Sequence, residues 1–137
     1  HALQGNVGRQ KAEVLAERLS KINPACEIIP VLRFFNAESS DELFKGGVDS
    51  DPFNYGVDYV IDAIDSVTSK CLLLAFCSMN GIPVVSCTGS AGRLDPTRVS
   101  VADLADSEGY PLARNVRRIL RQNYGFKSRG KFGIPAV

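Results

Sequence analysis

The stretch VDYVIDAIDSVTSKCLLLAFCSMNGIPVVSC, residues 57–87, decides the fold class. Residues 57–61 are mostly β-branched or aromatic and run into acidic residues, which predicts a strand. A helix is predicted from Ser66 to Met79, where Asn-Gly stops it, and residues 82–87 predict a second strand. A strand, a helix and a strand within about 30 residues form a right-handed crossover with parallel strands. The chain is therefore predicted to be an α/β protein with a doubly wound, mostly parallel, Rossmann-like sheet.

Patterns before this stretch predict further elements. Apolar spacing predicts a helix over residues 8–22, which Asn-Pro then stops. Residues 26–32 predict a short buried strand, and the Pro within it places the strand at an end or an edge. The serines at 39–40 predict a helix start, and residues 46–56 predict a loop.

The C-terminal part predicts two more features. Residues 92–94 and 98–101 predict a short antiparallel pair, because Asp-Pro-Thr separates them. A helix is predicted over residues 111–124, with Pro in its first turn. Residues 125–133 predict a loop.

Composition excludes several classes of protein. With 137 residues, 45% hydrophobic and 23% charged, the sequence is ordinary for one globular domain. No apolar run approaches the roughly 18 residues that a membrane span needs. Nothing at the N-terminus reads as a signal peptide. We expect a cytoplasmic protein, with attachment of a longer eukaryotic protein to an organellar membrane as the alternative left open.

The four cysteines are not spaced as CxxC, which disfavours a zinc ribbon or a redox dithiol. Apolar neighbours predict buried, reduced thiols at Cys71, Cys77 and Cys87. Of these, Cys87 at a strand end is the one candidate for a reactive thiol. The single histidine is His1, so Cys–His or Ser–His–Asp catalysis within the chain is disfavoured.

The net charge of +1 hides an asymmetry. Residues 1–108 hold 9 basic and 15 acidic residues, a balance of −6, whereas residues 109–137 hold 7 basic residues and no acid, a balance of +7. A basic end favours an anionic partner, nucleic acid first, with a solvated surface as the alternative. The candidate phosphate contacts are Arg114, Arg117, Arg118, Arg121, Lys127, Arg129 and Lys131. Four interleaved aromatic residues, Tyr110, Tyr124, Phe126 and Phe132, are candidates for stacking on bases.

Two carboxylates lie where the first parallel strand ends. Ligands of this fold class bind outside the carboxyl ends of the strands, and Asp62 and Asp65 lie there. Carboxylates so placed can bind Mg²⁺ or a ribose. The alternative is that Asp65 or Ser66 only caps the following helix.

Lys11 lies near the start of the predicted first helix, after two glycines, so it could neutralise phosphate charge, or it could be an ordinary surface lysine. The chain contains no GxGxxG and no GxxxxGK[ST]. The glycine cluster at residues 89–92 predicts a tight turn near the site. The main phosphate loop of a nucleotide site is therefore not expected among these residues.

Three stretches carry a family resemblance. NVGRQKAEVLAERLSKINPACEI resembles the helix that follows the phosphate loop in E1-like adenylating enzymes, and YVIDAIDSVTSKCLLLAFCSMNGIPVVS resembles their next strand, helix and strand. SCTGSAGRLDPTRVSVADLADSEGYPLARNVRRILR is similar to a segment of the tRNA threonylcarbamoyladenosine dehydratases. The resemblance covers roughly residues 1–125.

The resemblance implies an enzyme that uses ATP and Mg²⁺ to activate the carboxyl group of threonylcarbamoyladenosine in tRNA, which then cyclises with loss of water. It implies that Lys11 meets the ATP phosphates and that Asp65 coordinates Mg²⁺. Phe34 would pack near the adenine, and Asp62 and Ser66 would line the same site. It also implies a homodimer, a tRNA substrate and a sulfur-relay protein as a possible partner.

The resemblance also has gaps. The family's glycine-rich loop, first strand, ribose-binding acid and Arg-containing segment would precede His1, so we expect a truncated chain without ATP turnover. We expect residues 1–108 to form a partial ATP-binding domain and residues 109–137 to supply a basic helix and C-terminal segment of the same domain. Two alternatives stay open: an adenylyltransferase for a ubiquitin-like or sulfur-carrier protein, and a non-catalytic nucleotide-binding module.

Overall fold

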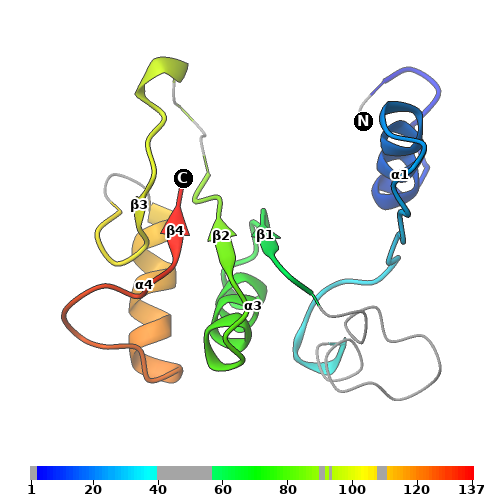
Figure 1. Ribbon diagram of the computed structural model, residues 1–137. Coiled ribbons are helices and arrows are strands. Elements are labelled where there is room, and N and C mark those ends of the chain that lie inside the picture. The colour runs from blue at the N-terminus through cyan, green and yellow to red at the C-terminus, as the bar shows by residue number, and fades with distance from the viewer. Residues whose placement is uncertain (1–2, 40–56, 90–91, 93, 108–110) are drawn as a thin grey trace.

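The computed structural model describes residues 3–39, 57–89, 92, 94–107 and 111–137. Its sheet has the strand order β1-β2-β4-β3. β1 (Val60–Asp62) pairs in parallel with β2 (Val84–Ser86), and β2 pairs in parallel with β4 (Pro135–Ala136). β3 (Ala102–Asp103) is antiparallel to β4 at the edge of the sheet (Figure 1). The predicted α/β class with a mostly parallel sheet is confirmed, although β1 and β2 are shorter than predicted.

Two helices cover one face of the sheet. α3 (Val67–Met79) is the crossover helix between β1 and β2, and α4 (Pro111–Asn123) packs beside it (Figure 1). The predicted bounds of both helices differ from these by one residue.

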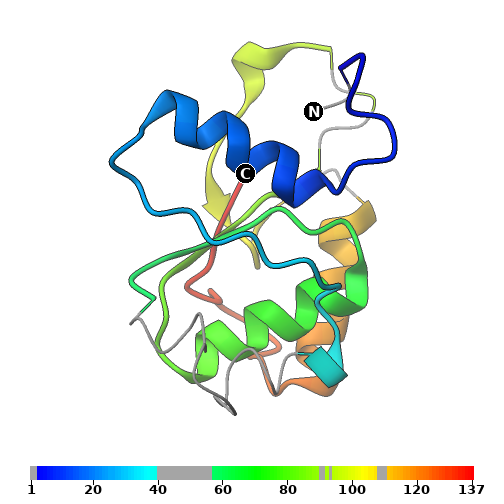
Figure 2. The same ribbon diagram turned by 90° about the vertical axis from the view of Figure 1, so that its right-hand side faces the viewer.

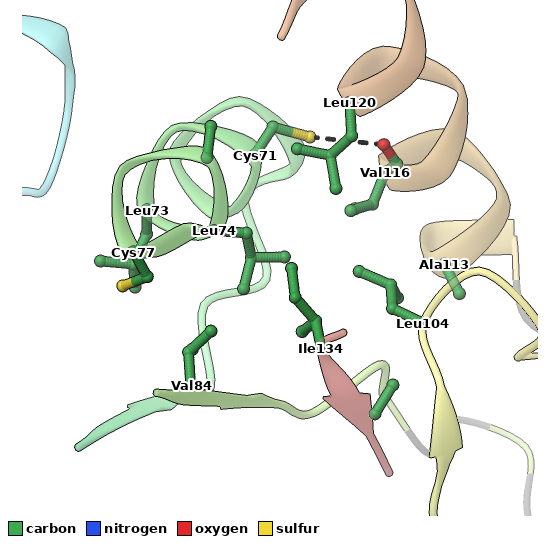
Figure 3. Packing of buried hydrophobic residues seen from close by; sticks show 12 residues of the cluster. Cys71, Leu73, Leu74, Cys77, Val84, Leu104, Ala113, Val116, Leu120 and Ile134 are labelled. Carbon is green, nitrogen blue, oxygen red and sulfur yellow. Dashed lines mark hydrogen bonds between the residues drawn. The ribbon is translucent and has the colours of Figure 1, made fainter. Parts of the chain in front are cut away.

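The core lies between these two helices and the sheet. Leu74 projects from α3, and Val116 and Leu120 project from α4 into the same apolar cluster (Figure 3). Leu104 and Ile134, which flank β3 and β4, close the cluster from the sheet side. Residues 111–137 thus supply a helix, a strand and part of the core.

α1 (Lys11–Ile22) stands apart from α3 and α4. In the view of Figure 2 the strands cross the space between α1 and the α3–α4 pair. Only Val14 of this helix is buried, while Leu15 and Ile22 are 47% and 75% exposed. The helix begins three residues later than predicted, because Gly8 has a φ of 87° and belongs to a preceding turn.

The strand predicted over residues 26–32 is wrong. These residues form no strand and are mostly exposed. Within the described residues β1 is the last strand on that side of the sheet, and Ile61 in it is 73% exposed. A segment becomes a strand only when a neighbouring strand satisfies its backbone groups, and in the described part of the chain residues 26–32 have no such neighbour.

The antiparallel pair predicted over residues 92–94 and 98–101 is also wrong. The Asp95 side chain accepts a bond from the Thr97 backbone N–H at 3.0 Å, which favours a 3₁₀ turn, η1 (Pro96–Arg98). The edge strand is instead β3, which begins directly after residues 98–101, and its partner is the C-terminal β4.

Asp103 anchors this edge. Its carboxylate accepts backbone N–H bonds from Ala105, Phe132 and Gly133 at 2.8–2.9 Å. Burial alone raises the pKa of a carboxyl group, but here the three backbone bonds outweigh it and lower the pKa of Asp103. The segment that leads into β4 is thus held in place by a side chain 30 residues earlier in the sequence.

The second predicted helix starts earlier than expected. The side chains of Asn36 and Ser39 each accept a bond from the other's backbone N–H, at 2.8 and 2.9 Å, which forms a capping box. Residues 37–39 are helical, so Asn36 rather than the serines at 39–40 caps the helix. The rest of this helix and the predicted loop over residues 46–56 lie outside the described residues.

Candidate functional site

The carboxyl ends of β1 and β2 meet the start of α3. After β1 the chain turns through residues 63–65 and enters α3, with Asp65 and Ser66 both exposed. Ser66 has extended backbone angles at the cap position, but its hydroxyl makes no capping bond. Ser66 therefore occupies the N-cap position without a side-chain capping bond, and the polar side chains of Asp65 and Ser66 both face solvent where parallel sheets bind ligands.

Asp62 lies at the same strand end but points inward. It is fully buried, and its Oδ2 accepts bonds from Lys70 Nζ and Ser86 Oγ, both at 2.6 Å. Its Oδ1 accepts the backbone N–H of Ile64 at 3.0 Å. With both oxygens already hydrogen-bonded, this carboxylate serves the protein's own groups.

Lys70 completes this buried cluster. Its ammonium group is 1% exposed, forms the ion pair with Asp62 and also donates to the Cys87 carbonyl at 3.0 Å. A third contact, to Ser86 Oγ, is 3.4 Å long. No buried side-chain nitrogen or oxygen in the described part of the chain lacks a partner, so the buried charges are fully compensated.

Sequence reasoning treated Lys70 only as part of a helix, although a signal was present. Lys70 begins the apolar run KCLLLAFC and lies four residues before the core residue Leu74. Residues four apart share a helix face, so Lys70 had to face the interior and needed an acidic partner. Asp62 and Asp65, the acids after the preceding strand, were the two candidates.

Phe34 lies beside the start of α3. Its neighbour Phe35 packs against the core, and the Phe35 carbonyl accepts a bond from Ser69 Oγ at 2.6 Å. Ser69 belongs to the first turn of α3, so this bond ties the Phe34 segment to the helix that Asp65 precedes. Phe34 itself is 91% exposed and presents a free aromatic face.

Lys11 is the first residue of α1 and is exposed. No hydrogen bond or ion pair joins it to Asp65 in the described ranges. The structure therefore brings Phe34, Asp65 and Ser66 to one region, buries Asp62 beneath it, and leaves Lys11 on a separate helix.

The seven basic residues of the C-terminal end fall into two groups. Arg117 donates to the Ser107 carbonyl and hydroxyl, and Arg121 donates to the Lys127 carbonyl and lies over the Phe132 ring at 5.1 Å. These two arginines are half-buried and hold the fold together. The exposed group consists of Arg114, Arg118, Lys127, Arg129 and Lys131.

The aromatic residues proposed for base stacking serve the core instead. Tyr124, Phe126 and Phe132 pack against the apolar cluster, and the last two meet edge to face at 4.9 Å. Tyr110 lies outside the described residues.

The cysteines divide by exposure. Cys71 and Cys77 are buried as predicted, and burial raises the pKa of both thiols to about 11. Cys87 is exposed, so its predicted burial is wrong; it follows the strand rather than lying within it. Across the described residues no group of three or more His, Cys, Asp or Glu side chains could hold a metal ion. In the same part of the chain, every helix is too short or too polar to cross a membrane.

Comparison with known proteins gives the same picture of the fold. The chain is 41% identical to the tRNA threonylcarbamoyladenosine dehydratase of Escherichia coli, over 100% of this chain and 48% of that protein. The Haemophilus influenzae dehydratase is 40% identical, over 99% of this chain and 49% of that one. The crystal structure of the Escherichia coli enzyme, TcdA, in complex with ATP matches with a TM-score of 0.85 at 40% identity, over 99% of this chain and 53% of that one.

The chain thus spans about half the length of the relatives it matches. A model of the ThiF family matches residues 2–110, which is most of the 137 residues. This chain belongs to the ThiF family.

Proposed function

We propose that the protein containing this chain is an ATP-dependent tRNA threonylcarbamoyladenosine dehydratase. The observation that carries the proposal is the exposed Asp65-Ser66 pair at the carboxyl end of β1, in a chain about 40% identical throughout to an enzyme solved with ATP. The activity is a proposal because this chain spans about half the length of the relatives it matches.

An ATP-bound Mg²⁺ fits the residues present. Mg²⁺ is typically held by one or two carboxylates together with waters and substrate phosphates. Asp65 offers one exposed carboxylate, whereas Asp62 has both oxygens engaged. A site with one protein ligand, completed by the triphosphate, therefore matches the described residues better than a site enclosed by protein.

The chain's own residues would each have one role. Asp65 would hold the ion that neutralises phosphate charge, and Lys11 would neutralise the phosphates from the start of α1. Phe34 would pack against the adenine. Attack of the substrate carboxylate on the α-phosphate would release pyrophosphate, and cyclisation of the acyl adenylate would release AMP, for a net loss of one water from the nucleoside.

Asp65→Asn is expected to lower the rate of water loss by about 100-fold or more, because charge stabilisation at the transferring phosphate is lost. The assay incubates the complete protein with ATP, Mg²⁺ and tRNA bearing threonylcarbamoyladenosine, then measures the digested nucleoside by mass spectrometry. Asp58→Asn is the matched control, since Asp58 is an exposed acid two residues before β1 begins. Equal rates of water loss for the two variants would show that Asp65 has no role in the reaction.

The same assay separates the alternatives. If ATP is cleaved to AMP but the nucleoside mass never changes, the substrate is the C-terminus of a ubiquitin-like or sulfur-carrier protein. If neither reaction occurs, the chain belongs to a nucleotide-binding module without catalysis.

The exposed basic residues of the C-terminal end support a tRNA substrate. Arg114 and Arg118 lie one turn apart on α4, and both are exposed. We propose that this side of α4, with Lys127, Arg129 and Lys131, contacts tRNA phosphates. In the same proposal the complete protein is a cytoplasmic homodimer, and a sulfur-relay protein is a possible partner.

Replacing Arg114 and Arg118 together with Ala is expected to weaken tRNA binding and to reduce the slope of log affinity against log salt by about 1 for each phosphate that the protein no longer neutralises. Filter binding at several salt concentrations measures both effects. Lys21→Ala removes an exposed basic residue from the last turn of α1 and is expected to leave the slope unchanged. A double variant with the wild-type slope would place the tRNA elsewhere.

A further inference from the structure

We propose that Lys70 is a positioning residue that acts through Asp62 to hold the turn presenting Asp65. The inference rests on the proposed function for its consequence in catalysis, but its geometric part stands on the contacts alone. Lys70 is 1% exposed, so it cannot itself reach a nucleotide.

The first step is the way in which Lys70 joins three elements. It projects from α3 and donates to Asp62 at the end of β1 and to the Cys87 carbonyl just after β2. The Cys87 backbone N–H in turn donates to the Asp62 carbonyl at 2.8 Å. The carboxyl ends of the two parallel strands are thus tied to each other and to the helix.

The second step is the orientation of the Asp62 carboxylate. Because Lys70 and Ser86 both donate to Oδ2, rotation of the carboxylate is restrained and Oδ1 is directed at the Ile64 N–H. That bond closes a turn of the kind aspartate forms with the residue two positions on. Ile64 directly precedes Asp65, so the same bond fixes the position of the Asp65 backbone, which bears the proposed Mg²⁺ ligand.

The third step is the choice of a charged side chain. A buried ion pair commonly adds little stability compared with apolar residues of similar volume. A methionine could fill the space but could not orient the carboxylate. The ammonium group has three protons, and three acceptors lie within 3.4 Å of it: Asp62 Oδ2, Ser86 Oγ and the Cys87 carbonyl. The charged side chain of Lys70 is therefore better explained by the orientation of the Asp62 carboxylate than by a gain in folding stability.

The test compares Lys70→Met with Leu74→Ala in the complete protein. Leu74 lies one turn further along α3 and is fully buried in the apolar core. Its truncation therefore weakens the same helix but leaves the hydrogen bonds of Lys70 and Asp62 in place. Two quantities are measured: the Mg²⁺ concentration that gives half-maximal AMP formation, and amide hydrogen exchange at Ile64 without ligand.

For Lys70→Met we expect the half-saturating Mg²⁺ concentration to rise about tenfold or more, since loss of a group that orients a metal ligand typically costs about 10–100-fold. Exchange at Ile64 should accelerate by at least a similar factor. Leu74→Ala should lower the amount of active protein while leaving the half-saturating Mg²⁺ concentration unchanged. If the two variants change the Mg²⁺ requirement equally, or if Ile64 exchange is unaltered in Lys70→Met, the positioning role is overturned.

Asp62→Asn gives a second variant that keeps the shape of the cluster. An amide has one oxygen, so it can accept from Lys70 or from Ile64 but cannot accept from both sides. We expect it to reproduce the exchange or the Mg²⁺ effect of Lys70→Met; wild-type values for both would contradict the proposal. If the wild-type protein itself forms no AMP, the proposed function fails, and Ile64 exchange alone decides the inference.

Discussion

Lys70→Met is expected to destabilise the protein by about 3–5 kcal/mol, because it leaves the buried Asp62 carboxylate without its counter-ion. Asp62 is fully buried, and among the described residues Ser86 Oγ would remain as its only side-chain donor. Urea unfolding of the complete protein, followed by circular dichroism, measures the change in the free energy of unfolding.

The double variant Lys70→Met/Asp62→Asn distinguishes a lost counter-ion from lost packing. With no charge left, the Asn oxygen can accept from Ile64 and its NH₂ group can donate to Ser86. We expect the double variant to be more stable than Lys70→Met, with a coupling energy of about 0.5–3 kcal/mol between the two sites. Strictly additive losses would mean that Lys70 contributes through packing alone.

The sequence predicted those parts of the fold whose signals are local. The helices around Leu74 and Val116 follow from apolar periodicity and clear stop signals, and the crossover rule gave the parallel pairing of β1 with β2. The strand over residues 26–32 has the same kind of local signal but no neighbour in the described residues. A strand depends on a partner distant in sequence, and local composition does not reveal whether that partner is there.

The prediction for the edge of the sheet was wrong for the same reason. β3 pairs with β4 more than 30 residues away, and the Asp103 carboxylate that holds this approach also acts at long range. Neither contact leaves a periodic trace in the sequence. The short-range alternative, a hairpin around Asp-Pro-Thr, matched the local turn residues and was still wrong.

At the site, position was easier to predict than role. The pattern predicts that Asp62 and Asp65 lie where the first parallel strand ends. Which of the two faces solvent depends on Lys70 and Ser86, from two other elements. A similar division separates Arg117, whose guanidinium bonds to the chain at Ser107, from the exposed Arg118 one residue on. Charge type was readable from sequence, whereas the choice between a structural and a ligand-facing role required tertiary contacts.

Leu74→Ala is expected to lower the free energy of unfolding by about 2–5 kcal/mol, the usual range for truncating a fully buried leucine. Leu74 is completely buried where α3, α4 and the sheet meet, among Val116, Leu120 and Ile134 (Figure 3). Close-packed neighbours from three elements cannot all move in to fill the space, so both the transfer and the cavity contributions apply.

Met79→Ala is the matched control on the same helix, because Met79 is 78% exposed. Exposed substitutions of this kind usually change stability by less than about 0.5 kcal/mol, so urea unfolding should separate the two variants clearly. Comparable losses would mean that the contact between α3 and α4 is not the core of the folded protein. α3 also carries Lys70 and begins two residues after Asp65. If α3 were not packed in the core, nothing would hold Asp65 and the rest of the candidate site in the position described.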